Sequence, residues 1–456
     1  MSTGGVTPDR LGQLHHEAVA RFEADRPRSG ELHRRARHAM PGGVPMSWMV
    51  KWPGSWPTFV AHAEGAHFTC VDGIDHVDLC LGDTGAMTGH SPAATVAAIR
   101  EQAGRGITTM LPTEDAIIAA EDLTRRFGLP QWQFTLTATD ANRHLIRYAR
   151  HVTGRPKVLV VEWCYHGSVD EAFAGLDADG RVVAREGNIG PPVDLDITTV
   201  VVPFNDVDAL QAALAREDVA CALLEPAMTN IGIVLPDPGY HEALREACDR
   251  HGTLLIIDET HTLCAGPGGC TRKWGLRPDA VVVGKTIGGG VPAAAFGMTE
   301  DWAHRIRSSI PREVIDIGGV GGTLAGNALS MAAVRATLTD VLTDAAFEAM
   351  TARAVDWTVG VQAGIDAAAL PWHVIRLGCR AEYAFAASAP RDGAEAALAD
   401  DLPLAQYLHL AALNDGVLLT PFHNMALMSP ATTADDVDRH SVSFARVARE
   451  LSSESG

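Results

Sequence analysis

The sequence predicts an α/β protein whose large domain is built on a mostly parallel sheet and which also has a smaller α+β domain. Two observations lead to this class. Between about residue 133 and residue 298, short apolar runs alternate with helical segments, and strands that alternate with helices in this way form parallel sheets covered on both faces. After about residue 335 the chain changes to long alanine-rich helical segments with a few short strands.

The expected domain boundaries follow from this change of pattern. We expect residues 1–80 to form an N-terminal helix and a hairpin on the small-domain side, residues 81–335 to form the large domain, and residues 336–456 to form the C-terminal small domain. A chain of 456 residues with 46% apolar content is long enough for two ordinary cores.

The elements can be placed in chain order from their periodicity. Apolar residues at helical spacing predict a helix from about residue 8 to 38, and Asp72-Gly73 predicts the turn of a hairpin over residues 66–80. A glycine-rich loop at residues 82–90 lacks the GxGxxG spacing of a dinucleotide site.

The large domain is expected to hold helices at 140–152 and 240–251 and buried strands at 156–162, 198–202, 219–224, 253–257, 280–283 and 293–298. The C-terminal part is expected to hold helices at 330–342, 345–365, 404–414 and from Thr433, a mixed stretch at 373–385 and a strand at 416–420.

Composition and charge argue against several classes of function. The net charge of −19 and the pI near 5.4 disfavour a nucleic-acid or acidic-membrane partner, since these require a basic patch. Residues 1–5 lack the start of a signal peptide, and no run approaches the roughly 18 apolar residues of a membrane helix. The eight cysteines show no CxxC motif, and His261 with Cys264 has no second pair, so neither disulfides nor a metal site is expected. We expect a soluble, cytoplasmic protein.

Four polar or reactive side chains stand where predicted strands end. They are Tyr165, Glu225, Asp258 and Lys285, and each follows a buried-type run. In open parallel sheets the ligand lies outside the carboxyl ends of the strands. The four side chains therefore predict one site at that edge of the sheet.

Lys285 is the residue around which this site is expected to be organised. The chain has four lysines, and only this one follows a buried run, residues 280–283, and precedes three glycines. A lysine flanked by apolar chain is expensive to bury in its charged form and tends to lose its proton, which makes it a nucleophile. The structural alternative is a lysine that reaches water from a strand end. Gly284-Lys285-Thr286 also resembles the end of a P-loop, but Asp279 stands where that motif requires its first glycine.

These residue types match the requirements of pyridoxal 5′-phosphate (PLP). A lysine forms a Schiff base with the cofactor, and an aspartate against the pyridine nitrogen keeps the ring protonated so that it acts as an electron sink. Lys285 and Asp258 can fill these roles. An aromatic side chain such as Tyr165 can cover the ring, and the start of the helix near Thr139 can bind the phosphate.

Three motifs follow one another in the chain: residues 254–259 (LLIIDE), 284–292 (GKTIGGGVP) and 322–327 (GTLAGN). Together they resemble the motifs of the fold-type I, class III (ω-type) aminotransferases, in the branch that includes glutamate-1-semialdehyde aminomutase. The resemblance extends from about Gly42 to the C-terminus. The resemblance implies that residues 81–335 form the PLP-binding large domain. It also implies a homodimer with its sites at the interface.

The resemblance also assigns further site residues. Ala138 and Thr139 stand at the family's phosphate loop, Tyr165 at the aromatic that stacks on the ring, and Asn230 at an asparagine near the ring hydroxyl. Thr260 replaces the usual valine that packs under the ring. Thr323 is expected to contact the cofactor phosphate of the neighbouring subunit.

The loop after Gly42-Gly43-Val44 differs from the family pattern. Aminomutase-like enzymes carry an arginine there that holds a substrate carboxylate, whereas this chain reads Pro45-Met46-Ser47-Trp48-Met49. An apolar loop favours a hydrophobic substrate. Arg380 could provide a carboxylate clamp instead, or could form an ion pair with Glu382.

We expect a PLP-dependent aminotransferase that moves an amino group, through the Lys285 Schiff base, between a hydrophobic or aromatic amine or amino acid and a keto acid or aldehyde. The alternative is an aminomutase or racemase of the glutamate-1-semialdehyde aminomutase type, because the proton-transfer lysine is common to both. A PLP-binding protein that has lost catalysis is a third reading, and the presence of both Lys285 and Asp258 argues against it.

Overall fold

The computed structural model describes residues 6–190, 194–310 and 319–453. Within these ranges the chain divides into two compact units. The first comprises residues 1–92, 345–389 and 397–456, and the second comprises residues 93–344 and 390–396. The boundaries expected from the sequence lie after residues 80 and 335, whereas those of the units lie after residues 92 and 344.

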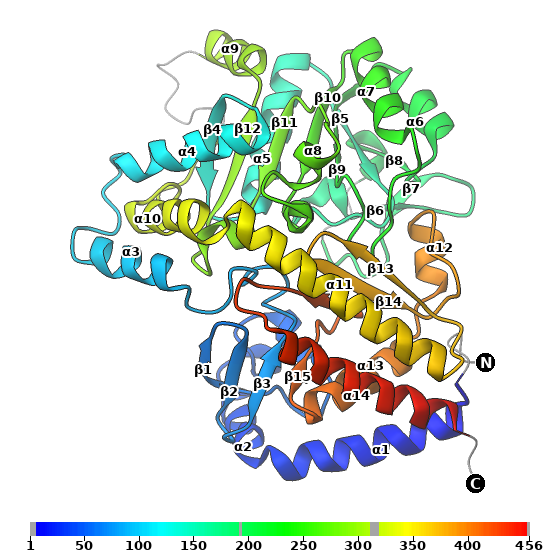
Figure 1. Ribbon diagram of the computed structural model, residues 1–456. Coiled ribbons are helices and arrows are strands. Elements are labelled where there is room, and N and C mark those ends of the chain that lie inside the picture. Colours follow the sequence, from blue (N-terminus) through cyan, green and yellow to red (C-terminus); the bar gives the residue numbers. More distant parts are fainter. Residues whose placement is uncertain (1–5, 191–193, 311–318, 454–456) are drawn as a thin grey trace. The chain divides into compact units, whose positions relative to one another are not determined.

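The second unit is built on a seven-stranded sheet of order β4-β12-β11-β10-β9-β5-β8 (Figure 1). The strands are β4 (Gln131–Thr135), β5 (Lys157–Val161), β8 (Thr199–Val202), β9 (Val219–Leu224), β10 (Leu254–Asp258), β11 (Ala280–Val283) and β12 (Ala294–Met298). Strands β11, β10, β9, β5 and β8 are mutually parallel, and β12 is antiparallel to both of its neighbours. The predicted mostly parallel sheet is confirmed.

Burial explains which strands could be recognised from the sequence. Every residue of β9, β10 and β11 is buried, and a continuous apolar run is typical of a strand covered on both faces. Edge strand β4 was not among the predicted strands, because its residues are mostly half-buried or exposed and form no such run.

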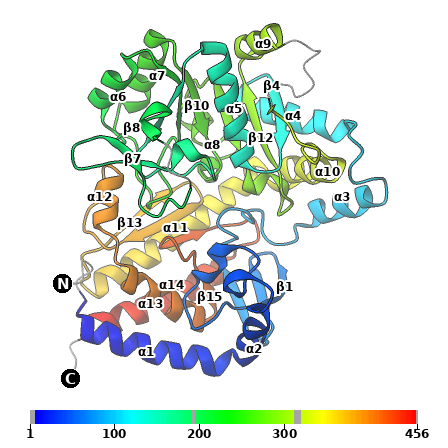
Figure 2. The same cartoon turned by 180° about the vertical axis from the view of Figure 1, so that it is seen from behind.

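Helices flank this sheet (Figures 1 and 2). The helices of the second unit are α3 (Ala93–Ala103), α4 (Glu114–Phe127), α5 (Ala138–Thr153), α6 (Val207–Leu214), α7 (Tyr240–His251), α8 (Gly269–Lys273), α9 (Glu300–Ser309) and α10 (Ala328–Ala336). α12 (Gly393–Leu398) begins in this unit, and β6 (Ala174–Leu176) pairs with β7 (Val182–Ala184) as a small hairpin. Helix α5 packs along β4, β12, β11 and β9, which fixes its N-terminus relative to the strand ends.

The first unit begins with two helices, so the single helix predicted over residues 8–38 is wrong. α1 (Pro8–Asp25) ends at Arg26, and α2 (Pro27–Ala36) starts at the next residue. Pro27 has no backbone N–H to continue α1, but it fits the first turn of a new helix, where that N–H has no partner. No helix in the described ranges is long and apolar enough to cross a membrane.

Two small sheets and three further helices complete the first unit. β1 (Val60–Glu64), β2 (His67–Cys70), β3 (Asp75–Asp78) and β15 (Val417–Leu418) form one sheet, and β13 (His373–Leu377), β14 (Arg380–Ala384) and β16 (Met425–Leu427) form the other. The predicted hairpin is β2–β3, with Gly73 at φ 81° in its turn. The helices are α11 (Asp344–Ala367), α13 (Leu402–Asn414) and α14 (Ala434–Ser452).

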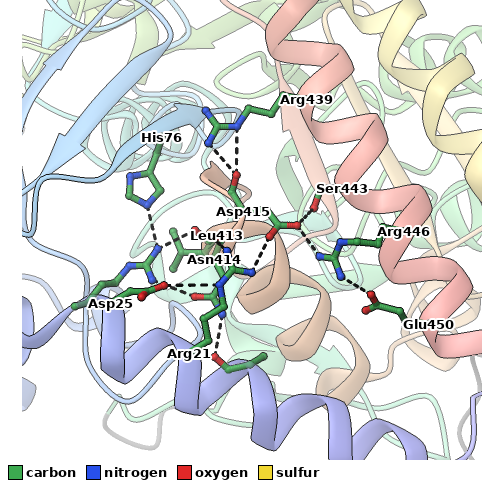
Figure 3. A network of polar contacts seen from close by, with 12 residues as sticks. Arg21, Asp25, His76, Leu413, Asn414, Asp415, Arg439, Ser443, Arg446 and Glu450 are labelled. Atoms are coloured by element: carbon green, nitrogen blue, oxygen red, sulfur yellow. Dashed lines mark hydrogen bonds and ion pairs between the residues drawn. The ribbon is translucent and has the colours of Figure 1, made fainter. Parts of the chain in front are cut away.

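A polar network holds α1, α13 and α14 together within the first unit (Figure 3). The carboxylate of Asp415, just after α13, lies 2.9 Å from Nη1 of Arg21 in α1 and 2.6 Å from Nη2 of Arg446 in α14. Ser443 donates a further hydrogen bond of 2.6 Å to the same carboxylate. Burial raises the pKa of Asp415, but these hydrogen bonds and the arginine charges outweigh it and lower that pKa overall.

Candidate active site

Asp258 and Lys285 lie at the carboxyl ends of two adjacent parallel strands. β10 ends at Asp258, which pairs with Val282 of β11. Lys285 begins a short 3-10 helix, η6 (Lys285–Gly288), immediately after β11. A Cβ atom on Gly284 would lie 3.0 Å from the Cβ atom of Ala138, so the first residue of α5 packs against the same strand end. Three of the predicted site residues therefore lie at one edge of the sheet.

The carboxylate of Asp258 is buried and accepts three hydrogen bonds. Its Oδ2 atom accepts from Nδ2 of Asn142 and from Nδ1 of His166, each at 2.9 Å, and its Oδ1 atom accepts from the backbone N–H of Thr260 at 3.0 Å. Burial raises the pKa of this carboxyl, but the contacts with His166, Thr260 and Asn142 outweigh it and lower the pKa to about 2. Asp258 is thus held ionised in a fixed orientation, as an aspartate that binds a protonated ring nitrogen must be.

Asn142 and His166 were not among the predicted site residues. Both had a usable signal: Asn142 lies one helical turn after Ala138, and His166 directly follows Tyr165. Side chains four residues apart share a helix face. Their meeting at Asp258 nevertheless depends on how α5 and the loop after β5 pack, which local patterns do not reveal.

The N-terminus of α5 and the loop after β5 approach each other closely. Thr137 caps the helix by accepting a hydrogen bond from the backbone N–H of Asp140, and the Oγ1 atom of Thr139 accepts one from the backbone N–H of Ser168 at 3.1 Å. Gly167 has φ 75°, and a Cβ atom there would lie 1.9 Å from the Oγ1 atom of Thr139. A helix N-terminus carries partial positive charge, so this junction favours an anion.

Tyr165 and Asn230 lie around the same loop after β5. The ring of Tyr165 is half-buried and packs edge-on against Phe173, with ring centroids 6.1 Å apart. Asn230 donates a hydrogen bond of 3.0 Å from Nδ2 to the backbone carbonyl of Trp163. The loop that carries Tyr165 is therefore anchored by Asn230.

Thr260 and Thr323 differ in their surroundings. Thr260 follows Asp258 closely and is buried, and its hydroxyl has no hydrogen-bond partner in the described part of the chain. Thr323 lies exposed in the turns before α10, and no hydrogen bond joins it to another predicted site residue within the described ranges. Among the predicted site residues in the described part of the chain, Thr323 is the one that is exposed.

The side chain of Lys285 meets that of His261. The Nζ atom of Lys285 lies 2.7 Å from the Nε2 atom of His261, in the loop after β10. Lys285 has φ 50°, a left-handed backbone conformation that is unusual for a residue with a side chain. Among the described residues no cluster of His, Cys, Asp and Glu could hold a metal ion. The sequence presents His261 only as half of a possible metal pair and gives no signal for its contact with Lys285.

Glu225 is a second buried carboxyl at a strand end. It accepts hydrogen bonds from the hydroxyl and from the backbone N–H of Thr229. Burial raises the pKa of Glu225 to about 7, although the contacts with Thr229 and His166 lower it in part. Glu225 therefore differs from Asp258, whose pKa falls chiefly because of the hydrogen bond and the charge of His166.

The loop that lacks an arginine lies in the first unit and packs on Phe422. The rings of Trp48 and Trp52 meet Phe422 edge-on at centroid distances of 5.7 and 5.8 Å, and the Nζ atom of Lys51 lies 5.2 Å from the centre of the same ring. A cavity of about 650 Å³ is lined in part by Trp52, Phe422 and His409. Met49 and Trp48 remain partly exposed, so the loop presents apolar surface.

Arg380 forms the ion pair that was its structural alternative. The residue is fully buried on β14, and its Nε atom donates a hydrogen bond of 2.7 Å to the Oε1 atom of Glu382. Its guanidinium is therefore already engaged with a carboxylate inside the first unit.

Residues 49–442 match the family model described as aminotransferase class-III. The chain belongs to the class III aminotransferases. Its curated relatives include a glutamate-1-semialdehyde 2,1-aminomutase from Sorangium cellulosum, strain So ce56, which is 33% identical over 426 residues; the match covers 91% of this chain and 95% of that protein. The predicted family and branch are confirmed.

Solved structures also place this chain near the same branch. A glutamate-1-semialdehyde aminomutase from Pseudomonas aeruginosa PAO1 is 48% identical with a TM-score of 0.96, covering 98% of this chain and 100% of the other. A variant of that enzyme, in complex with PMP, is 47% identical with the same TM-score of 0.96 and the same coverage of 98% and 100%. A β-phenylalanine aminotransferase from Variovorax paradoxus is 27% identical with a TM-score of 0.84, covering 96% and 97%. The predicted fold type is confirmed.

Proposed function

We propose that this class III aminotransferase is a PLP-dependent enzyme that moves an amino group within one substrate molecule, as an aminomutase does. The observation that carries the proposal is the likeness, over 91–98% of the chain, to enzymes named as glutamate-1-semialdehyde aminomutases. It favours the alternative formed from the sequence over an aminotransferase for hydrophobic amines.

The residues of the candidate active site fit PLP. The buried Thr260 hydroxyl, which has no hydrogen-bond partner among the described residues, lies two residues from the hydrogen-bonded carboxylate of Asp258. Gly167 and Thr139 approach each other so closely that a Cβ atom on Gly167 would not fit. The N-terminus of α5, which begins beside them, is a suitable place for a phosphate. Lys285 supplies the amine at the end of the neighbouring strand.

Each side chain then has a definite task. Lys285 would hold the cofactor through Nζ, Asp258 would bind its pyridinium nitrogen, and Thr139 with the start of α5 would bind its phosphate. Tyr165, Asn230 and Thr260 would surround the ring. When bound, PLP supplies an electron sink that stabilises negative charge on the substrate carbon. The Nζ atom of Lys285 would remove the proton from that carbon and return it at another position, as general base and then general acid.

The substrate need not be glutamate-1-semialdehyde. No arginine occurs between Val44 and Val50, and Trp48 and Met49 leave apolar surface exposed there. This loop supports a second candidate function, an aminotransferase acting on a hydrophobic or aromatic amine or amino acid with a keto acid or aldehyde acceptor. The 27% identity to a β-phenylalanine aminotransferase is in keeping with it.

A panel of amino aldehydes, amines and amino acids, each given alone to the PLP-loaded protein, tests the proposal. An aminomutase converts one compound into its isomer over many turnovers without an acceptor. Conversion of the cofactor to pyridoxamine phosphate with one equivalent of keto product, and turnover only after an acceptor is added, would instead support the aminotransferase. Lys285→Ala should abolish turnover by either route and still bind PLP, and undiminished turnover in that variant would refute the role of Lys285.

A homodimer with sites at its interface and a cytoplasmic location complete the proposal. The assembly matters for the chemistry, because Thr323 is the predicted site residue that the single chain leaves exposed. In a symmetric dimer, one surface of each subunit meets the same surface of the other, so each chain can complete its partner's site.

A further inference from the structure

The contact between His261 and Lys285 restricts where protons can reside. An ammonium group only donates hydrogen bonds, and an imidazole nitrogen accepts one only when it carries no proton. The Nε2 and Nζ atoms are 2.7 Å apart, so one proton lies between them and at least one of the two groups is neutral. The two side chains therefore form a proton-sharing pair.

The backbone on the lysine side of this pair is held in place by close packing. Lys285 has φ 50° and is followed by a helical turn that ends at Gly289, with φ 58°. A Cβ atom on Gly289 would lie 2.5 Å from the Oγ1 atom of Thr337 and 2.9 Å from a side-chain carbon of Thr95. Those two threonines hydrogen-bond each other at 2.9 Å, so the wall against which the turn packs is itself fixed.

The backbone on the histidine side is held by the buried carboxylate of Glu259. Glu259 accepts a hydrogen bond of 2.5 Å from the hydroxyl of Thr262, and further hydrogen bonds from the backbone N–H groups of Cys270 and Thr271. A Cβ atom on Gly269 would lie 2.3 Å from the same carboxylate. Glu259 thus ties the loop that carries His261 to α8, and Thr262 closes that loop onto the same carboxylate.

The neighbouring Asp258 is less suited to take a proton from Lys285. Its carboxylate already accepts hydrogen bonds from Asn142, His166 and Thr260, and its pKa is lowered to about 2. A carboxylate with so low a pKa is a weak base near neutral pH. The Nε2 atom of His261, which lies 2.7 Å from Nζ, is the better placed proton acceptor of the two.

We propose that His261 is a further catalytic residue, which takes a proton from Lys285 through Nε2. One N–H bond at Nζ breaks, one N–H bond at Nε2 forms, and the electron pair stays on Nζ, so that the amine becomes a nucleophile and a base. The inference deepens the proposed function and rests on it, since it gives Lys285 the neutral amine that cofactor attachment and proton removal both require.

Competitive acetylation of the full-length chain, freed of bound cofactor, tests this inference without a substrate. A small amine-directed acetylating reagent at neutral pH modifies unprotonated lysines, and peptide mass spectrometry gives the rate at each position. Lys51, Lys157 and Lys273 serve as internal standards in the same sample. His261→Ala removes the acceptor. His261→Gln keeps a hydrogen-bond acceptor and a similar size but takes up no proton, and it carries the test if the alanine variant does not fold.

Acetylation of Lys285 should be about 100-fold slower in both variants, because general-base catalysis contributes at least about that factor. The acetylation rates of the three standards should not change. Added imidazole should restore the rate in His261→Ala at Lys285 alone. A wild-type rate in either variant, or slow modification of His261→Ala that imidazole leaves unchanged, overturns the proposal. PLP binding and turnover are measured on separate samples, so a failure of the proposed function would be seen independently of this result.

Discussion

The Nδ1 atom of His166 lies 2.9 Å from the Oδ2 atom of Asp258, and both side chains are buried. Burial lowers the pKa of His166, but Cys164 and the hydrogen bond and charge of Asp258 raise it overall, to about 10. The pKa of Asp258 is lowered to about 2. The two groups therefore stay charged together over a wide range of pH, and the imidazolium holds the carboxylate ionised.

This pair should give the protein a pH-dependent part of its stability. The contribution of Asp258 is present above its ordinary pKa of 3.8 and is lost as the pH falls through about 2. The contribution of His166 is present in full below its ordinary pKa of 6.5 and declines as the pH rises toward about 10. His166→Asn keeps a hydrogen-bond donor but no charge. The melting temperature of His166→Asn should lie furthest below that of the wild type between pH 3.8 and pH 6.5, the ordinary pKa values of the two groups. The difference should shrink toward alkaline pH.

Removing the donor altogether should be more damaging. His166→Ala leaves the carboxylate of Asp258 buried without its charged partner. The free energy of unfolding should therefore fall by about 3 kcal/mol or more. His16→Asn, on the exposed face of α1, is the matched control and should show no pH-dependent difference in calorimetry. An equal loss for His166→Asn at every pH would contradict the charged pair.

Glu225 should have the opposite effect on stability. Its folded-state pKa of about 7 lies above the ordinary 4.5, so the folded protein binds the proton more tightly and loses stability as the pH rises from 4.5 to 7. Glu225→Gln removes this penalty, which is on the order of 3 kcal/mol. The variant should melt higher than the wild type above neutral pH and the same at acidic pH. Glu246→Gln, exposed on α7, is the control, and a pH-independent shift in Glu225→Gln would count against a buried carboxyl.

Gly167 tests the junction between the N-terminus of α5 and the loop after β5. An alanine there would adopt φ 75° and place its Cβ atom 1.9 Å from the Oγ1 atom of Thr139, so the first turn of α5 must shift. We expect Gly167→Ala to weaken PLP binding at least about tenfold, a change of 1.4 kcal/mol in binding free energy, as measured by cofactor titration in the visible range. Gly175→Ala, at a position with nothing within 4 Å of the added carbon, should bind PLP normally.

The parts of the fold that could be predicted are those that produce a recognisable pattern in consecutive residues. Residues 280–283 form a continuous apolar run because β11 is buried on both faces, and Lys285 stands out because a charged residue ends such a run. The break between α1 and α2 was also readable, because Pro27 cannot continue α1 but fits the first turn of a new helix. Edge strand β4 had no comparable signal.

The contacts within the site could not be predicted in the same way. Asn142 and His166 converge on Asp258 when α5 and the loop after β5 pack on the sheet, and His261 meets Lys285 where the loop after β10 approaches the end of β11. Each of these contacts joins segments that are far apart in the chain. Residue types and spacing indicated the cofactor and the lysine, whereas the tertiary arrangement determines which side chains position them.

Mixed dimers provide a test of whether Thr323 acts on the other subunit. Thr323→Asp places a negative charge on an exposed turn, and this charge should repel a phosphate wherever that residue meets the cofactor. The homodimer of this variant should therefore bind little PLP, although its Lys285 is intact. Lys285→Ala has the reverse defect, because it keeps Thr323 but cannot form a covalent bond to the cofactor.

In a mixed dimer of the two variants, the Lys285 of one chain would face the intact Thr323 of the other. If Thr323 acts across the interface, equal mixing under conditions that exchange subunits should restore about one quarter of the wild-type sites, since half of the dimers are mixed and each has one intact site. Reduction with borohydride would then trap PLP on Lys285 of the Thr323→Asp chain, detected by peptide mass. If Thr323 serves its own chain, every Lys285 in the mixture faces an aspartate, and mixing restores no trapped cofactor.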